Sequence, residues 1–568
     1  MSPAKVTNRV VIDHAAEPLT TGPSRYNKGD PARFEADWLP KIKAYNDAIT
    51  AAIPKEYLAP AELLPEGDLD TADFDATTVP EKVMDAEDFA ITELTATEIA
   101  KKIKDKDLTA VKVITAFIKR ATIAHQLTNC AMEILFDYGL ARAQELDEYY
   151  EKTGKTIGPL HGVPLSLKEH YNFAGRVTHG SFVGLLDNVT PEFSVTNQIM
   201  YDLGCPQCLM HLDSFNNITG RGRNARKLKM SPGGSPSGEG SLIAMKGSPL
   251  GIGSDIGGSI RSPAAFNGIW GLKPSSKRLS MAKSVVPTID TYDELINGVY
   301  GPMSNSPEDL ELFMKAYFTQ EPWMKDQQCV PIPWREVPQP KAEELTIGIC
   351  YDDGVVKPHP PVLRGLKHVE QKLRAAGVNV VTWEPHRVYE AAEIANVAYT
   401  CDGNYASVER LAASGEPTAP LTDHYLSMGK GDKALTGVET QFYANSREIL
   451  RQEYLELFNS RGVDFIIAPT YVGVAPKPHE VKYWGYTSLW NILDYTCVTF
   501  PTGIKADKKL DPEDKEYTPR NEYEDYEYGL YDADAADGLP IGLTLAGRRY
   551  TEEAVLKASK VVADALAA

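Results

Sequence analysis

Short apolar runs alternate with longer amphipathic segments along most of the chain. Runs such as "DFIIAPT" from Asp464 and "IGLTLAGR" from Ile541 end at polar or turn-forming residues, which predicts buried strands. Segments 360–376, 439–460 and 552–567 repeat apolar residues at helical spacing. This alternation predicts an α/β fold with a mainly parallel or mixed sheet covered by helices on both faces. Further strands are predicted at 161–168, 206–212, 345–352 and 379–383.

The N-terminal part has a different pattern. A helix is predicted over 31–53, interrupted by Pro40, and an acidic connector rich in Asp, Ala and Pro follows it. We interpret residues 1–85 as a peripheral helical extension. Residues 86–568 are interpreted as one large domain, because the glycine and proline breaks do not isolate a second core.

Residues 507–537 form the most acidic stretch of the chain. They include twelve acidic and four basic residues, a net charge of −8. Such a run is typical of a solvated insertion or flexible loop. Its five tyrosines offer the alternative that it docks on a neighbouring part of the protein.

Charge and hydropathy narrow the class of partner. The 568-residue chain has 59 basic and 78 acidic side chains, a formal net charge of −19, which argues against nucleic acid and anionic membranes. It has no apolar run of about 18 residues, and residues 1–30 lack the apolar core of a secretory signal. We therefore expect a cytoplasmic protein without a membrane span that binds a neutral or apolar small molecule. A homodimer stays open.

The seven cysteines are scattered and do not indicate a disulfide framework. Cys205 and Cys208 have the spacing of a redox or half-zinc motif, but no second pair accompanies them. Two buried thiols near a strand are the preferred interpretation. No metal site is expected.

Glycine and serine are crowded in "SPGGSPSGEGS" from Ser231 and "GIGSDIGGSIRSPAAFNG" from Gly251. Neither stretch contains G-x-S-x-G, so the nucleophile elbow of an α/β-hydrolase is not indicated. The second stretch lacks the lysine of a phosphate-binding loop, which argues against a nucleotide. A serine, histidine and aspartate triad assembled in space stays open. The nearest histidines have no supporting motif and are given structural roles: His161, His170 and His179.

The sequence "SDIGGSIR" favours a different chemistry. Its small residues allow backbone N–H groups to converge just before Ser259, as an oxyanion hole requires. A serine hydroxyl is a weak nucleophile until a base accepts its proton. A lysine can be that base if burial lowers its pKa, and a second hydroxyl can relay the proton.

The run "GGSPSGEGSLIAMKGSPLGIGSDIGGSIRSPAAFNGIWGLKPS" and the segment "GPLHGVPLSLKEHYNFAG" resemble the amidase signature of serine amidases. The order Lys168, Ser235, Ser259 and the 24-residue separation of the two serines also agree with that family. The resemblance extends from about Leu94 to the C-terminus and looks closest to the fungal acetamidase and general amidase branch. It implies the amidase-signature α/β/α fold and hydrolysis of the C–N bond of a small or medium linear amide.

The same resemblance implies roles for individual residues. Ser259 is the expected acyl nucleophile, Ser235 the bridging serine after a cis peptide bond, and Lys168 the base. The resulting acyl-enzyme needs no metal or organic cofactor. The implied oxyanion donors are the backbone amides of Ile256, Gly257, Gly258 and Ser259.

Other polar residues near these motifs have less specific signals. Asp213 and Ser237 are candidate substrate-binding residues, with turn or helix capping as the alternative. Ser237 and Ser254 are also candidates for hydrogen bonds near the relay. Asp255 and Arg261 are expected to pair as a structural brace.

Two departures from the family pattern leave the function open to alternatives. Pro236 replaces the second serine of "GGSSGG" and lacks a hydrogen-bond donor, and Glu169 stands where many relatives have Asp. One alternative is a biosynthetic acyltransferase or amide-forming enzyme that uses the same acyl-enzyme. Another is a disabled, amidase-like binding protein.

Overall fold

The computed structural model describes residues 29–211, 215–285 and 295–568. Within these residues, eleven strands form one sheet. Their order across the sheet is β1 (Ala131–Ile134), β3 (Gln207–His211), β2 (Leu165–Lys168), β6 (Leu250–Asp255), β8 (Val299–Ser304), β7 (Trp270–Lys273), β12 (Thr496–Lys505), β13 (Pro540–Gly547), β11 (Phe465–Pro469), β9 (Thr346–Ile349) and β10 (Asn379–Thr382). A separate hairpin joins β4 (Phe215–Asn216) and β5 (Gly220–Arg221).

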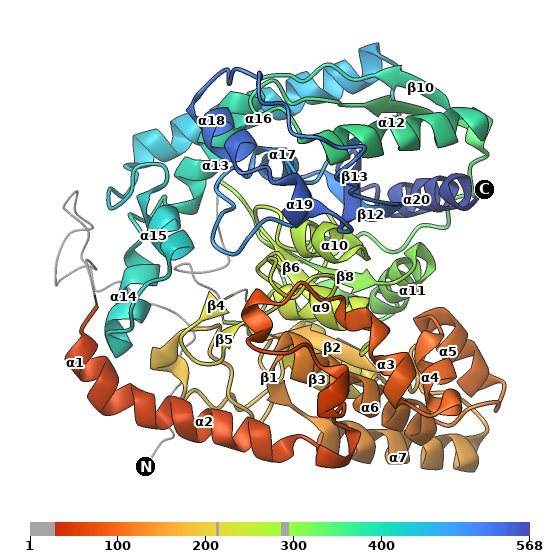
Figure 1. The fold of residues 1–568 in the computed structure, drawn as a ribbon. Helices are drawn as coiled ribbons and strands as arrows, with labels where there is room; N and C mark the ends of the chain where they lie inside the picture. The colour runs from red at the N-terminus through yellow and green to blue at the C-terminus, as the bar shows by residue number, and fades with distance from the viewer. Residues whose placement is uncertain (1–28, 212–214, 286–294) are drawn as a thin grey trace.

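The large sheet is mixed, as predicted. Strand β2 is parallel to β3 and β6, and β9 is parallel to β10 and β11. The strands between these two groups, β8, β7, β12 and β13, pair antiparallel with their neighbours. In Figure 1 the sheet extends from β1 and β3 at the bottom to β10 at the top. Two parallel units are therefore joined through an antiparallel centre.

Helices cover both faces of this sheet. Neighbouring residues of β11 demonstrate the two faces, because Ile467 belongs to an apolar cluster with α12 and α20, whereas Ile466 belongs to one with α13 and α16. The helices on the Ile467 side include α5 (Ala96–Lys104), α11 (Pro307–Phe318), α12 (Pro360–Ala375) and α20 (Glu552–Ala567). Those on the Ile466 side include α10 (Arg261–Asn267), α13 (Val388–Tyr399), α16 (Gly437–Ser460) and α17 (Gly485–Ile492).

The remaining helices complete the two outer layers and the periphery. They are α1 (Pro31–Arg33), α2 (Leu39–Ala52), α3 (Pro80–Val83), α4 (Ala86–Glu93), α6 (Ala110–Thr128), α7 (Phe136–Thr153), α8 (Val195–Asp202), α9 (Ser237–Ala244), α14 (Tyr405–Ser414), α15 (Pro420–Ser427), α18 (Glu522–Gly529) and α19 (Ala533–Ala536). Over the described part of the chain, no helix has both the length and the apolar character to cross a membrane.

The N-terminal helices lie along one edge of the molecule (Figure 1). A π-helical turn at Phe34–Trp38 joins α1 to α2, and Pro40 lies in the first turn of α2, where a missing N–H is tolerated. The irregularity therefore precedes the predicted break. Tyr45 of α2 donates to the Met132 carbonyl at 2.9 Å, and Asn46 donates to the Ile218 carbonyl at 2.6 Å. These bonds attach α2 to β1 and to the turn after β4.

The acidic stretch 507–537 is docked, in agreement with the second of its two interpretations. It contains α18 and α19, and the Glu527 side chain is completely buried. Glu527 accepts hydrogen bonds from the Tyr471 hydroxyl at 2.6 Å and from the Tyr483 amide at 2.5 Å. A flexible loop is the wrong interpretation for this segment, because buried carboxylates and tyrosines tie it to the body of the protein.

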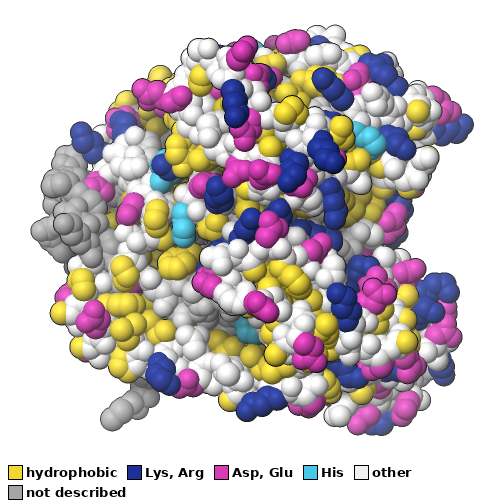
Figure 2. All heavy atoms as spheres, viewed as in Figure 1, with side chains coloured by type: hydrophobic (Ala, Val, Ile, Leu, Met, Phe, Trp, Pro, Cys, Tyr) yellow, Lys and Arg dark blue, Asp and Glu magenta, His cyan; other side chains and the backbone are white. Residues whose placement is uncertain are grey.

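The net negative charge does not produce a face of one sign in the view of Figure 2. Acidic and basic side chains are interspersed over the face shown there. Among the described cysteine side chains, all are free thiols: Cys130, Cys205, Cys329, Cys350, Cys401 and Cys497.

Candidate active site

Lys168 is the last residue of β2, and its side chain is only 7% exposed. Its Nζ contacts the Ser235 hydroxyl and donates to Ser254 Oγ at 2.9 Å. Ser254 belongs to β6, which runs parallel to β2. The carboxyl ends of two adjacent parallel strands thus bring the lysine and two hydroxyls together.

A sharp turn presents Ser235 to Lys168. The Gly234–Ser235 peptide bond is cis, as the resemblance implied, and Gly233 has a φ of +82°. A Cβ atom on Gly233 would lie 2.7 Å from the backbone of Pro263, so only glycine fits this approach. Ser262 donates to the Gly234 carbonyl at 3.0 Å. The turn is therefore held against the first turn of α10, the helix that begins two residues after Ser259.

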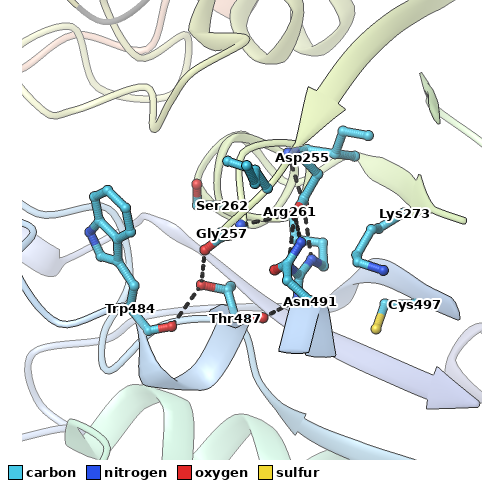
Figure 3. A network of polar contacts seen from close by, with 12 residues as sticks. Asp255, Gly257, Arg261, Ser262, Lys273, Trp484, Thr487, Asn491 and Cys497 are labelled. Carbon is cyan, nitrogen blue, oxygen red and sulfur yellow. Dashed lines mark hydrogen bonds and ion pairs between the residues drawn. The ribbon is translucent and has the colours of Figure 1, made fainter. Parts of the chain in front are cut away.

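A buried ion pair supports the loop that carries Ser259 (Figure 3). Arg261 donates to both carboxylate oxygens of Asp255, at 3.0 and 2.9 Å, and both side chains are completely buried. Asn491 donates to Asp255 at 2.9 Å and accepts from Arg261 at 2.6 Å. Burial acts to raise the pKa of Asp255, but the charge and hydrogen bonds of Arg261 lower it to about 2. The predicted brace is confirmed.

The loop between Asp255 and Ser259 has its carbonyls anchored by other elements. Thr487 of α17 donates to the Gly257 carbonyl at 2.5 Å, and Tyr399 of α13 donates to the Ile256 carbonyl at 3.2 Å. A Cβ atom on Gly258, whose φ is +126°, would lie 2.5 Å from Thr487 Oγ1. The fixed carbonyls orient the peptide planes, and therefore the N–H groups, of the loop.

The amide of Gly258 differs from those of the other three predicted oxyanion donors. Its amide donates to Asp255 Oδ1 at 2.9 Å, so this N–H is already used in bracing the loop. Within residues 29–211, 215–285 and 295–568, no protein acceptor pairs with the amides of Ile256, Gly257 and Ser259. These three amides remain as candidate donors to an oxyanion.

The histidines near the motifs have the environment of structural residues. His161, His170 and His179 are all at least 92% buried. Burial lowers the pKa of His179 to about 3 and lowers that of His161, and burial together with the Lys168 charge lowers that of His170. Such imidazoles resist accepting a proton.

The arrangement agrees with comparisons to known proteins. A family model described as Amidase matches residues 112–556. This chain belongs to the amidase signature family. It is 36% identical to an acetamidase of Aspergillus oryzae over 86% of this chain and 93% of that protein. An acetamidase of Emericella nidulans is also 36% identical, over 85% and 91% of the two chains. A solved structure of fatty acid amide hydrolase has a TM-score of 0.93 and 41% identity, covering 97% of this chain and 98% of its own.

The resemblance and the mixed α/β fold are thus confirmed, and the protein is an amidase that hydrolyses non-peptide C–N bonds. The proline that departs from the family motif causes no visible disruption. Pro236 lies just before α9, in a position where no N–H is required, and Ser254 provides the additional hydroxyl contact to Lys168. The carboxylate of Glu169 accepts the amides of His179 and Gly180 at 2.8 and 2.7 Å.

The structure describes one of the two candidate substrate-binding residues, Ser237. Ser237 is the first residue of α9 and has no exposed surface, so its hydroxyl cannot touch a substrate without rearrangement of the amidase. The role of Ser237 in substrate binding stays a prediction. Asp213 lies outside the described residues.

A buried acid that the motifs did not indicate lies beside β2, the strand that carries Lys168. Glu239 of α9 is completely buried and accepts from Ser166 Oγ at 2.5 Å. Ser166 precedes Lys168 by two residues in β2, so their side chains share one face of the strand. A Cβ on Gly251, the β6 partner of Ser166, would lie 2.3 Å from Glu239 Oε2. In the sequence, only its position within the motif "SGEGS" could have indicated that Glu239 lies near the site.

Proposed function

We propose that this amidase cleaves small or medium carboxylic amides through an acyl-enzyme on Ser259, with Ser235 as relay and Lys168 as base. The observation that carries the proposal is the contact of Lys168 Nζ with the Ser235 hydroxyl. In addition, the hydrogen bond from Ser262 to the Gly234 carbonyl supports a close approach of the Ser235 turn to the Ser259 loop.

The proposed reaction begins with neutral Lys168. As Ser259 Oγ attacks the amide carbon, its proton passes to Ser235 Oγ, and the Ser235 proton passes to Lys168 Nζ. The substrate oxygen becomes an oxyanion that accepts the amides of Ile256, Gly257 and Ser259.

Collapse of the tetrahedral intermediate breaks the C–N bond and leaves an ester on Ser259. The departing nitrogen receives a proton through Ser235, which restores neutral Lys168. A water molecule then attacks the ester, and its proton passes through Ser235 to Lys168. When the acyl–oxygen bond breaks, that proton returns through Ser235 to Ser259 Oγ, and the carboxylic acid leaves. Atoms and charges balance without a metal or organic cofactor.

The names of the relatives span short and long acyl groups, since they include acetamidases and a fatty acid amide hydrolase. Small and medium amides are the first substrates to test, because two of these relatives are named acetamidases, and a long-chain amide should be tested beside them. The cytoplasmic location and the homodimer remain predictions from the sequence.

The decisive experiment compares wild type with Ser259→Ala using a fluorophosphonate probe and an amide substrate. We expect the wild type to be labelled at Ser259 and the variant to lose both labelling and turnover, with an unchanged circular dichroism spectrum. Ser446→Ala, which changes a half-buried serine on α16 whose hydroxyl bonds the Phe442 carbonyl, is the control and should behave as wild type. Normal turnover by Ser259→Ala would refute the proposal.

Product analysis distinguishes the alternatives that keep or lose the acyl-enzyme. With a competing amine or alcohol present, the hydrolase should release mainly the free acid, whereas an acyltransferase should form the new amide or ester. A folded wild-type protein that is neither labelled nor active would favour the disabled, amidase-like binding protein.

A further inference from the structure

A carboxyl group of the acidic stretch binds the backbone just before α17. Glu527 of α18 is completely buried, and its Oε1 accepts the amides of Lys482 and Tyr483 at 2.8 and 2.5 Å. Its Oε2 accepts the Tyr471 hydroxyl at 2.6 Å. One buried side chain thus satisfies two consecutive backbone amides, which fixes the course of the chain at this point.

The backbone that Glu527 holds leads directly into the helix that anchors the loop before Ser259. Helix α17 begins two residues after Tyr483 and carries Thr487 in its first turn. Thr487 Oγ1 donates to the Gly257 carbonyl at 2.5 Å, as Figure 3 shows. The position of the start of α17 therefore determines where the Gly257 carbonyl is held.

A second set of bonds from the acidic stretch acts on the same helix. The Tyr486 hydroxyl of α17 donates to the Val356 carbonyl at 2.7 Å, and Asn521 of the acidic stretch donates to the neighbouring Val355 carbonyl at 2.7 Å. The acidic stretch thus holds the start of α17 directly, through Glu527, and also through the loop after β9.

The packing around α17 leaves room for the helix to move if these bonds are lost. A cavity of about 20 Å³ borders the helix, and its lining includes Gly485, Tyr486, Leu489 and Trp490. Atoms that line a void lack contacts on that side, so packing constrains them less. The hydrogen bonds at the start of α17 therefore contribute more to fixing its position.

We propose that Glu527 is a positioning residue for amide hydrolysis, which acts through the start of α17 on the loop before Ser259. The inference rests on the proposed function, which assigns the amides of Gly257 and Ser259 to the oxyanion. Thr487 fixes the carbonyl that lies between these two amides in the chain. A shift of α17 would misorient donors that interact most strongly with the charge of the transition state, so the loss should appear in kcat rather than in KM.

The alternative is that Glu527 only stabilises the docked stretch, and Asp511 provides a matched control for this. Asp511 is another buried acid of the same stretch. Its carboxylate accepts two hydrogen bonds from Arg364 of α12, both at 2.7 Å, and one from the Asp507 amide at 2.9 Å. These contacts lead to α12 instead of α17.

The test compares steady-state kinetics of full-chain variants on the amide that the wild type hydrolyses fastest. Glu527→Ala should lower kcat roughly three- to tenfold with little change in KM. Glu527→Gln keeps an acceptor for the two amides and should restore most of the wild-type kcat. Asp511→Ala should lower the melting temperature but keep its kcat.

A double variant tests the path through Thr487. Thr487→Val already lacks the bond to the Gly257 carbonyl, so adding Glu527→Ala should lower kcat by less than about twofold further. A further loss as large as that in the wild-type background would overturn the path through α17.

The remaining outcomes also decide. Wild-type kcat in Glu527→Ala, or an equal loss of kcat in Asp511→Ala, would overturn the inference. If Glu527→Ala does not fold, Glu527→Asp takes its place, because the shorter side chain withdraws the carboxyl group from the two amides. Normal turnover by Ser259→Ala would instead refute the proposed function, whatever the Glu527 variants show.

Discussion

The Asp255 carboxylate binds the Arg261 guanidinium and the Gly258 amide at the same time. Asp255 Oδ1 accepts from both groups at 2.9 Å, while Oδ2 accepts Arg261 Nε at 3.0 Å and the Ile260 amide at 3.1 Å. One buried ion pair therefore determines the course of the backbone on both sides of Ser259. The Gly258 amide, one of the four predicted oxyanion donors, therefore already has a protein acceptor.

Breaking this ion pair should affect stability and catalysis together. Arg261→Met leaves Asp255 buried without its counter-charge, and we expect the free energy of unfolding to fall by about 3–5 kcal/mol. The kcat should fall as well, because the loop loses its anchor. Urea denaturation and steady-state kinetics measure the two effects. An Arg261→Met protein with wild-type stability would contradict the role of the pair as a brace.

The pH dependence of stability should reflect Asp255. Its folded-state pKa of about 2 lies below the value of about 3.9 for an unfolded aspartate, so its contribution is present above pH 4 and is lost as the pH falls toward 2. Thermal melts of wild type and Asp255→Asn between pH 5 and 2 measure this. The variant should be less stable at pH 5, and the difference should shrink as the pH falls. A constant difference would argue against the lowered pKa.

Thr487 should matter for kcat rather than for KM. Thr487→Val removes the hydrogen bond to the Gly257 carbonyl while keeping the side-chain volume. The Gly257–Gly258 peptide then keeps only its bond to Asp255, so the neighbouring amides of Gly257 and Ser259 become less well oriented. We expect kcat to fall by up to about tenfold. Thr470→Val is the control, because that buried hydroxyl bonds Thr544 within the sheet. Equal losses in both variants would indicate a general packing effect.

Removing Lys168 should lower the rate most near neutral pH. Lys168→Met eliminates the proton acceptor for Ser235, and loss of a general base typically costs about 10²–10⁴-fold. The pH profile of kcat/KM should lose its acidic limb. Lys227→Met is a matched control, since Lys227 is equally buried but bonds the Asp537 carbonyl. A normal rate and pH profile in Lys168→Met would exclude the relay.

Docking of the acidic stretch should weaken as the pH rises through neutrality. Burial raises the pKa of Glu527 to about 7, so its contribution to stability is present below about pH 4.5 and is lost as the pH rises through 7. The melting temperature should therefore fall more between pH 5 and 8 in wild type than in Glu527→Gln. Glu516→Gln changes an exposed glutamate of the same stretch and should retain the wild-type profile. Identical profiles for all three proteins would contradict the prediction.

Several strands were predictable because their residues have strong strand preferences. The apolar runs at 464–470 and 541–548 became β11 and β13. In contrast, β6 ("LGIGSD") and β8 ("VYGPMS") contain glycine or proline and were not predicted. Their pairing with each other and with β2 and β7 overrides these weak local preferences.

The candidate site likewise contains residues that local sequence predicted and residues that only the fold brought together. The motifs identified Lys168 and Ser235, which the structure brings into contact, because their chemistry is carried by short segments with unusual composition. Ser254 was foreseen only as a general candidate for hydrogen bonding. The anchors of the Ser259 loop were missed, since Thr487 and Tyr399 lie more than 140 residues away in sequence and have no distinctive local pattern.

Local sequence was enough to predict the family, several strands of the sheet and the candidate relay, because each depends on the type and spacing of neighbouring residues. Folding decided which backbone amides around Ser259 remain without a protein acceptor, which hydroxyls surround Lys168, and that the acidic stretch is docked. The docked acidic stretch and the anchors of the Ser259 loop depend on distances between residues far apart in the chain. The bond from the Gly258 amide to Asp255 likewise belongs to the buried Asp255–Arg261 pair, which exists only in the folded protein.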